Sequence, residues 1–265
     1  DVVGENLTER FQLPLWRFCN SGTEATLEGA RLMRANTGRD KIIKIEGTYH
    51  GHHDSLMFSV GPDPALMGPR EHPNTLPQAL GIPDAFAELV VVVPFNDLEA
   101  AGRAFAEHEG EIAGMFVEPA MMNCGVILPD EGYLQGLKDL CHANGAYLAF
   151  DEVKTGATIA YGGAVEAFGV VPDIICLAKA IGGGLPCGAI GATRELYRPV
   201  VEDEYDMAGT FNGNPLTLAA SKATLLEVLT PDVYAQLNRV DRAMKDGLSA
   251  VIERYALPAY VTGIG

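Results

Sequence analysis

The sequence predicts an α/β protein built on a mainly parallel sheet of seven strands with helices on both faces. Short apolar segments alternate along the chain with segments whose apolar residues recur at helical spacing. Several of the short segments are apolar throughout, which is typical of strands that are covered on both faces. No internal repeat interrupts this alternation.

We expect the elements to follow one another in the order of these segments. The strands are expected at Leu15–Cys19, Lys41–Glu46, Leu89–Pro94, Gly114–Glu118, Ala146–Asp151, Ile174–Ala178 and Gly188–Ala192. The helices are expected at Glu24–Thr37, Leu98–Glu107, Tyr133–Asn144, Thr217–Leu229 and Asp232–Tyr255. Gly61–Phe86 contains six prolines and few periodic apolar residues, so it should form a long irregular loop. Val261–Gly265 should begin a further strand and turn.

The composition limits the classes of partner. With 265 residues, of which 48% are hydrophobic, the chain can bury one large core. Its formal net charge of −16 repels phosphate backbones and anionic lipids, so neither a nucleic acid nor a membrane surface is an expected partner. The longest aliphatic run, Leu89–Val93, is too short to cross a bilayer. The five cysteines are scattered without a CxxC pair, which indicates reduced thiols in a cytoplasmic protein.

A polar segment, Asn20–Glu24, follows the first predicted strand and opens a helix. In open parallel sheets, ligands bind at the carboxyl ends of the strands. Gly22 lets the backbone approach a ligand, and the free N–H groups of a helix N-terminus can bind an anion. The alternative interpretation is that Ser21 or Thr23 merely caps the helix.

Asp151 and Lys179 each end an apolar strand. The carboxylate of Asp151 could hold a cation, pair with an arginine or bond a protonated ring nitrogen, or it could be a solvated strand end. Lys179 is followed by the glycines Gly182–Gly184, and in such a turn its amine would lose solvation. Desolvation favours the uncharged amine, which attacks carbonyl groups. A lysine that extends into solvent is the alternative.

Three histidines and an aspartate lie within Gly47–Asp54. His50 and His52 could converge on a metal from an extended segment, whereas His53 would point away. Tyr49 and His50 could instead stack on a planar ligand, and a purely structural loop is the third possibility. We expect no metal at this segment.

Three further polar residues stand at strand ends or near helix starts. Glu118 ends a predicted strand, and Asn123 lies a few residues later. Thr210 lies in a turn-rich segment that leads into the helix at Thr217. Each is ordinary by itself, but their shared placement makes them candidates for the same site.

Taken together, these residues resemble the class III aminotransferases, which are fold-type I enzymes dependent on pyridoxal 5′-phosphate (PLP). The resemblance is strongest to the branch that contains glutamate-1-semialdehyde 2,1-aminomutase, and it covers essentially the whole chain. The segments that carry it are Arg17–Ala25, Thr37–Ile43, Gly47–His52, Phe150–Gly156, Ala160–Ala164, Lys179–Pro186 and Gly209–Pro215. It implies a PLP-binding large domain over residues 1–255, incomplete at its N-terminus, and the start of a C-terminal small domain over residues 256–265.

The resemblance also implies roles for the catalytic residues. Lys179 would hold PLP as a Schiff base and would move a proton at the substrate Cα as general base and then acid. Asp151 would pair with the protonated ring nitrogen, and Ser21–Thr23 would cradle the phosphate. Thr210 would reach the phosphate of a partner subunit, which implies a homodimer with shared active sites.

The remaining roles concern the cofactor ring. Tyr49 would stack on one face of the ring with His50 beside it, and Val153 would pack on the other face. Glu118 and Asn123 would line the site near the ring hydroxyl. The implied activity is transfer of an amino group from an amino acid or amine to a keto acid or aldehyde, with β-amino acids among the candidate donors.

The sequence departs from the family pattern in two places. Ala157–Ile159 stands where many members carry an arginine that clamps a substrate carboxylate. Gly61–Phe86 replaces the gating loop of the aminomutases, which favours an external amino acceptor over intramolecular transfer. Arg70 in this loop is either an anion contact or a solvated arginine. Two alternatives therefore stay open: an aminomutase, and a non-catalytic PLP-fold protein or inactive fragment.

Overall fold

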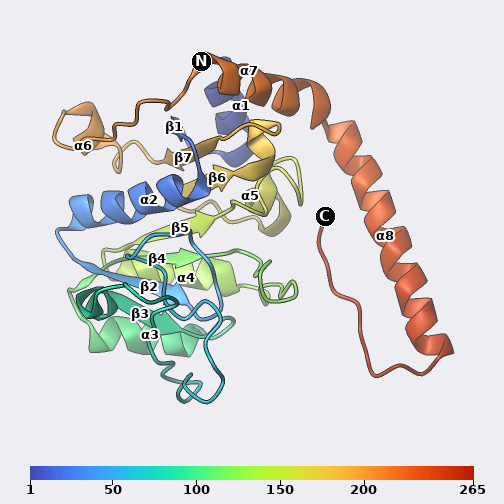
Figure 1. Cartoon of the computed structure of the whole chain (residues 1–265), viewed down its shortest axis with the longest axis horizontal. Helices are drawn as coiled ribbons and strands as arrows, with labels where there is room; N and C mark the ends of the chain where they lie inside the picture. Colours follow the sequence, from blue (N-terminus) through green and yellow to red (C-terminus); the bar gives the residue numbers. More distant parts are fainter.

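The computed structural model describes residues 1–265 and contains one seven-stranded sheet with the order β1-β7-β6-β5-β4-β2-β3 (Figure 1). The strands are β1 (Leu15–Cys19), β2 (Lys41–Ile45), β3 (Val90–Val93), β4 (Ile112–Val117), β5 (Tyr147–Asp151), β6 (Ile174–Ala178) and β7 (Gly188–Ala192). All seven lie where the sequence predicts them, with shifts of no more than two residues at either end.

Eight α-helices accompany the sheet. They are α1 (Val2–Phe11), α2 (Gly22–Thr37), α3 (Leu98–Glu107), α4 (Tyr133–Ala143), α5 (Gly163–Phe168), α6 (Arg198–Val201), α7 (Pro215–Ala223) and α8 (Pro231–Arg254). Two 3₁₀ helices and one π-helix complete the fold: η1 (Asp84–Leu89), η2 (Lys179–Gly182) and η3 (Thr224–Val228).

The predicted, mainly parallel sheet is confirmed. β3, β2, β4, β5 and β6 pair in parallel, whereas β7 is antiparallel to both β6 and β1. Because β7 is reversed relative to both neighbours, β1 runs in the same direction as β6. The carboxyl ends of six strands therefore lie at one edge of the sheet.

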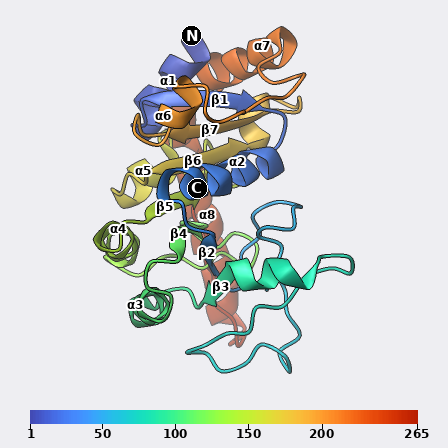
Figure 2. The same cartoon turned by 90° about the vertical axis from the view of Figure 1, so that its left-hand side faces the viewer.

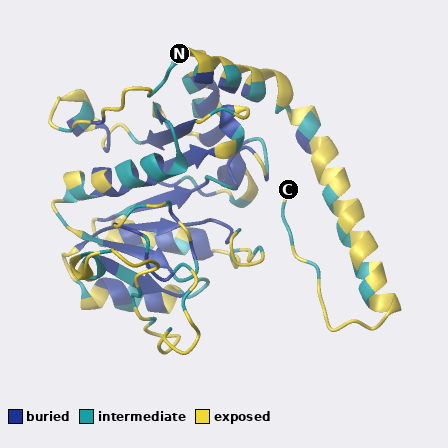
Figure 3. Ribbon diagram, in the orientation of Figure 1, coloured by how far each residue is buried: buried dark blue, intermediate teal, exposed yellow.

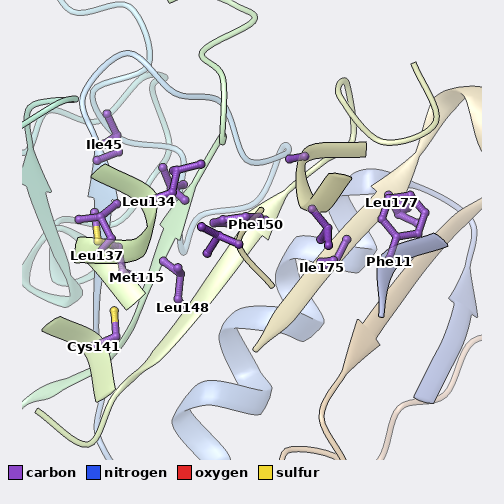
Figure 4. Packing of buried hydrophobic residues seen from close by; sticks show 14 of the residues in the cluster. Phe11, Ile45, Met115, Leu134, Leu137, Cys141, Leu148, Phe150, Ile175 and Leu177 are labelled. Carbon is purple, nitrogen blue, oxygen red and sulfur yellow. The ribbon is translucent and has the colours of Figure 1, made fainter. Parts of the chain in front are cut away.

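Strand alternation divides the core into two layers, one on each face of the sheet. Leu148 and Phe150 of β5 pack on the face covered by α3 and α4, together with the β6 side chains Ile175 and Leu177 (Figure 4). Ala149 faces the opposite layer, which α2 covers. Figure 2 shows α3 and α4 on one side of the sheet and α2 on the other. The predicted two-sided cover is thus confirmed.

The helices predicted from the sequence need correction in several places. Helix α1 was not expected, because its buried face includes the polar Asn6 and Arg10, which interrupt the apolar periodicity. The short helices α5 and α6 were also missed. The helix predicted at Thr217–Leu229 is instead α7 followed by η3. Gly61–Phe86 is irregular as expected, except that η1 begins at Asp84.

The C-terminal residues form no strand, contrary to the expectation for Val261–Gly265. They return toward the sheet after α8, whose surface is largely exposed (Figure 3). The Lys245 amine donates to the Gly263 carbonyl at 2.9 Å, and the Thr262 hydroxyl donates to the Val126 carbonyl at 2.9 Å. The first bond satisfies one carbonyl of the segment, and the second ties the segment to Val126 without any strand pairing. The division into domains at residue 255 stays a prediction.

Arg10 joins the first helix to the end of η3. Its buried guanidinium donates to the carbonyls of Leu225 at 2.5 Å and Leu229 at 2.7 Å, and to the Tyr161 carbonyl at 3.0 Å. The guanidinium carbon also lies 3.7 Å from the centre of the Tyr161 ring. Carbonyls at the end of a helix lack partners within the helix, so Arg10 supplies the donors that they need.

None of the helices combines the length and the apolar character that a bilayer crossing requires.

Candidate active site

A cavity of about 320 Å³ opens at the edge where the carboxyl ends of the strands meet. We call it the strand-end cavity. It is lined by all the residues to which the family resemblance gives a role in PLP binding, except His50 and Thr210. The residues of the predicted site that line it are Ser21, Gly22, Thr23, Tyr49, Glu118, Asn123, Asp151, Val153 and Lys179.

The N-terminus of α2 forms one wall of the strand-end cavity. The Ser21 hydroxyl accepts a hydrogen bond from the Glu24 N–H at 3.2 Å, and the Glu24 carboxylate accepts from the Asn20 N–H at 2.7 Å. These reciprocal bonds fix the start of the helix. A Cβ at Gly22 would lie 2.8 Å from a methyl carbon of Val153, so only glycine allows this close packing. Ser21 is therefore both a cap and a cavity residue.

Asp151 lies at the end of β5 with 5% of its surface exposed. One carboxylate oxygen accepts the Val153 N–H at 3.0 Å, and the other lies 2.8 Å from Nδ1 of His50. His50 is fully buried, and its ring packs against Phe116 with the centroids 5.4 Å apart. His50 thus does not line the cavity itself but holds the Asp151 carboxylate from behind.

The three histidines of the Gly47–Asp54 segment have different partners. His50 contacts the carboxylate at the end of β5, whereas Nε2 of His53 lies 3.3 Å from the Thr26 hydroxyl. Burial, followed by the proximity of His50, lowers the pKa of His53 to about 4, so His53 is neutral at physiological pH. His52 is exposed. The segment therefore orients side chains separately instead of gathering them around one point.

Lys179 begins η2 directly after β6. Its backbone has a φ of 52°, in the left-handed region that residues other than glycine rarely adopt. Such strained backbone conformations cluster at functional sites. Its amine makes neither a hydrogen bond nor an ion pair within residues 1–265. The expectation that this amine would be desolvated is wrong, because Lys179 is exposed in the open side of the cavity. The amine is free to react with a ligand.

Glu118 holds together the residues that form the opposite wall of the strand-end cavity. Only 4% of this residue is exposed, and its carboxylate accepts the N–H groups of Tyr49 at 2.9 Å and Met122 at 3.0 Å. It also accepts the side-chain amide of Asn123 at 2.8 Å. The Lys154 amine in turn donates to the amide oxygen of Asn123 at 2.6 Å. The sequence prediction included Glu118 and Asn123 but missed Lys154.

A second buried lysine escaped the sequence prediction. Lys44 of β2 is fully buried, and its amine donates to the Thr48 carbonyl at 2.9 Å and to the Phe58 carbonyl. Burial lowers its pKa to about 7, with Glu118 acting in the opposite direction. Lys44 thereby holds both ends of the segment that carries Tyr49. A lysine within the apolar run Lys41–Ile45 was the signal that could have revealed it.

The sequence prediction also missed the supporting role of Glu152. It is fully buried on the side of β5 opposite to Asp151, and one oxygen accepts the Ala164 N–H at 2.7 Å and the Thr155 hydroxyl at 3.1 Å. Its other oxygen has no partner. Burial raises the pKa of Glu152 to about 8, so the carboxyl is largely protonated at neutral pH.

Two candidate regions lie away from the strand-end cavity. Thr210 is exposed and lines a separate hollow, in a loop tied to Asn20 by a 2.9 Å bond from that amide to Asn212. No residue of the loop Gly61–Phe86 lines the cavity, and Arg70 in this loop is exposed. Arg70 is therefore a solvated arginine with no contact to the site.

Comparison with known proteins identifies the class to which this fold and site belong. The model of the class III aminotransferase family matches residues 2–265, so the chain belongs to that family. This family is PLP-dependent. The chain is 43% identical over 250 residues to glutamate-1-semialdehyde 2,1-aminomutase 2 of Halalkalibacterium halodurans, a match that covers 94% of this chain and 56% of that relative. The chain thus spans little more than half the length of such relatives.

The solved structures that share the fold include a transaminase and an aminomutase. An omega-transaminase from Sphaerobacter thermophilus superposes with a TM-score of 0.93 at 35% identity, over 99% of this chain and 60% of that one. A glutamate-1-semialdehyde aminomutase variant from Pseudomonas aeruginosa, in complex with PMP, gives a TM-score of 0.87 at 31% identity. That match covers 100% of this chain and 58% of the other. The predicted fold-type I architecture is confirmed.

The buried carboxyl of Glu152 makes stability depend on pH. In the unfolded chain it ionises near 4.5, whereas in the folded chain it ionises near 8. Between these values only the unfolded state loses the proton, so ionisation of Glu152 destabilises the fold as the pH rises. We expect Glu152→Gln, which mimics the protonated carboxyl, to gain stability over the parent chain across this range, by on the order of 3 kcal/mol.

Urea denaturation at a series of pH values measures this gain. The control is Glu109→Gln, which changes an exposed carboxyl that forms no ion pair. A difference between Glu152→Gln and the parent chain that stays constant from pH 4.5 to pH 8 would contradict the assignment.

Proposed function

We propose that the chain is the cofactor-binding part of a PLP-dependent aminotransferase that moves an amino group from an amino acid or amine to a keto acid or aldehyde. One observation carries the proposal. A single cavity combines the N-terminus of α2, the buried carboxylate of Asp151 and the free amine of Lys179, which come from distant parts of the sequence. These three groups match the anionic, basic and electrophilic parts of PLP.

The chemistry of each wall fits one part of the cofactor. The helix N-terminus at Gly22 and Thr23 offers N–H groups and a favourable dipole to a phosphate. The carboxylate of Asp151 is held in place by the Val153 N–H and by His50, and a carboxylate at this position can pair with a protonated ring nitrogen. Lys179 presents an amine without partners, which can attach to the carbonyl carbon.

Tyr49 and Val153 complete the proposed binding mode. Both line the strand-end cavity, and Tyr49 is 38% exposed, so its ring can stack on a planar ligand. Val153 follows Asp151 and is pressed against the glycine at the start of α2. An aromatic ring and a branched aliphatic side chain are suited to enclose the two faces of a pyridine ring.

The proposed chemistry depends on a proton transfer by Lys179. When bound, PLP supplies an electron sink for the charge left at the substrate Cα. Lys179 accepts the proton from Cα as a general base and returns it as a general acid. Asp151, supported by His50, keeps the ring nitrogen protonated. Of the two lysines that line the cavity, only Lys179 has an amine that is free of hydrogen bonds, because Lys154 is bound to Asn123.

Attachment of the cofactor to Lys179 can be tested directly. After incubation with PLP and reduction with borohydride, we expect mass spectrometry of the digested chain to find a pyridoxyl group on Lys179. Lys179→Ala should lose the modification and the visible absorbance, because no other free amine lines the cavity. The control Lys222→Met, at an exposed lysine of α7, should keep both. Modification of a different lysine, or a parent chain that stays colourless with PLP, would refute the proposal.

An aminomutase is the second candidate function, and it is supported by the 43% identity to glutamate-1-semialdehyde 2,1-aminomutase 2. Against it stands the loop Gly61–Phe86, which contributes nothing to the cavity wall and therefore leaves the cavity open to an external acceptor. The third reading, a non-catalytic protein, is disfavoured by the free amine of Lys179 beside an intact carboxylate.

Substrate panels distinguish these functions. We expect α-amino, β-amino and simple amine donors, offered with pyruvate or 2-oxoglutarate, to include one that yields the new amino acid of the acceptor, detected by chromatography. The physical reason is that no residue of the loop Gly61–Phe86 lines the strand-end cavity. Turnover of an aldehyde that carries its amino group on the neighbouring carbon, without any acceptor, would instead identify an aminomutase. A chain that binds PLP but turns over neither class would indicate a non-catalytic protein.

We further propose that the chain forms a homodimer in which Thr210 contacts the phosphate bound by the partner subunit. Thr210 is exposed and lines no part of its own strand-end cavity, and the adjacent Phe211 is 70% exposed. An exposed aromatic side chain beside a hydroxyl suits an interface that also reaches a ligand. Light scattering should give twice the monomer mass of 28.2 kDa, and Phe211→Asp should reduce the measured mass toward that of a single chain. A monomeric parent chain would contradict this.

We also propose a cytoplasmic location. All five cysteines are unpaired, and four of them are buried as thiols, which suits a reducing compartment. Fractionation of cells that express the chain tests this location.

A further inference from the structure

We propose that Lys154 is a positioning residue that fixes the amide of Asn123, so that Asn123 presents one N–H to the ring oxygen of bound PLP. This inference rests on the proposed function, because it concerns the same cofactor. Lys154 stands in the turn after Asp151, and the resemblance to the aminotransferases assigns it no role. Its effect would act entirely through Asn123.

The orientation of a side-chain amide is decided by what lies at each end. A lysine amine can only donate hydrogen bonds, and an ionised carboxylate can only accept them. Lys154 lies 2.6 Å from the oxygen of the Asn123 amide, and Glu118 lies 2.8 Å from its nitrogen. A flipped amide would place N–H groups against the amine and an oxygen against the carboxylate. Both contacts would then be repulsive, so only one orientation is stable.

The carboxylate at the far end of this chain of bonds is itself immobile. Glu118 is 4% exposed, and backbone N–H groups of Tyr49 and Met122 bind its two oxygens. Asn123 is therefore held between a fixed acceptor and a charged donor. Its amide nitrogen carries two hydrogens, of which Glu118 receives one. The second hydrogen is left for a ligand in the strand-end cavity, which Asn123 lines.

The order of the strands indicates which part of PLP would receive this hydrogen. The start of α2 lies beside β6 and β7, since a Cβ on Gly22 would contact Ala178 and one on Gly188 would contact Ser21. Asp151 ends β5, and Glu118 follows β4 on the other side of it. In PLP the phosphate arm and the ring oxygen lie on opposite sides of the axis through the ring nitrogen. With the phosphate at α2 and the nitrogen at Asp151, the ring oxygen faces the Glu118 side.

A donor and a cation near the ring oxygen favour its ionised form. We therefore expect Lys154→Met to raise the pH midpoint at which the visible absorbance of the PLP-loaded chain titrates, by about one unit. The dissociation constant for PLP should rise about fivefold, which corresponds to the loss of one hydrogen bond. Both quantities are measured by absorbance titration and need no substrate turnover.

A double-variant cycle tests whether Lys154 acts through its neighbour. Asn123→Ala should shift the pH midpoint in the same direction. The double variant Asn123→Ala/Lys154→Met should show little further shift beyond that of Asn123→Ala alone. Lys154→Arg, which keeps a charged donor, should restore most of the parent behaviour, and Lys222→Met serves as the control. These results would support the proposal.

Other outcomes would overturn it. An unchanged midpoint in Lys154→Met, or effects of Lys154→Met and Asn123→Ala that add fully, would show that Lys154 does not act through Asn123. Failure of the parent chain to bind PLP would overturn the inference together with the proposed function. Binding of PLP by the parent chain without any effect of Lys154→Met would overturn the inference alone.

Discussion

The strand-end cavity depends on the direction of the strands. Six of the seven strands run the same way, although β1 is separated from β6 by the reversed β7. If β1 ran with β7 instead, the N-terminus of α2 would lie at the opposite edge of the sheet from Asp151 and Lys179. The shared direction of β1, β5 and β6 thus allows a helix dipole, a carboxylate and an amine to face the same space.

Beneath the cavity, buried polar groups supply rigidity that apolar packing alone would not give. His50 supports the Asp151 carboxylate, Lys44 fastens the segment around Tyr49 by its two ends, and Glu152 anchors the turn after β5 from the opposite face. Each of these side chains loses solvation and recovers part of the cost through directional bonds. This arrangement limits the rotation of the residues above them, and a site for a planar cofactor needs that constraint.

The sheet and most of the cavity lining could be predicted from the sequence, because both depend on short-range patterns. Apolar runs located every strand, and the residues at strand ends were found because parallel strands share an edge. The supporting residues were harder to find. Lys154 resembles any surface lysine until its contact with Asn123 is seen, and helix α1 escaped because Arg10 is buried by partners more than 150 residues away. Long-range polar contacts leave no periodic trace in a sequence.

The bonds of Arg10 have a consequence for the order in which the molecule can assemble. The guanidinium completes its set of acceptors only when Leu225 and Leu229 are in place, so α1 closes against η3, which follows the last strand in the sequence. During synthesis, α1 would leave the ribosome long before these carbonyls exist. The Arg10 guanidinium is therefore solvated until then, and the docking of α1 against η3 becomes a late step in the assembly of this part of the molecule.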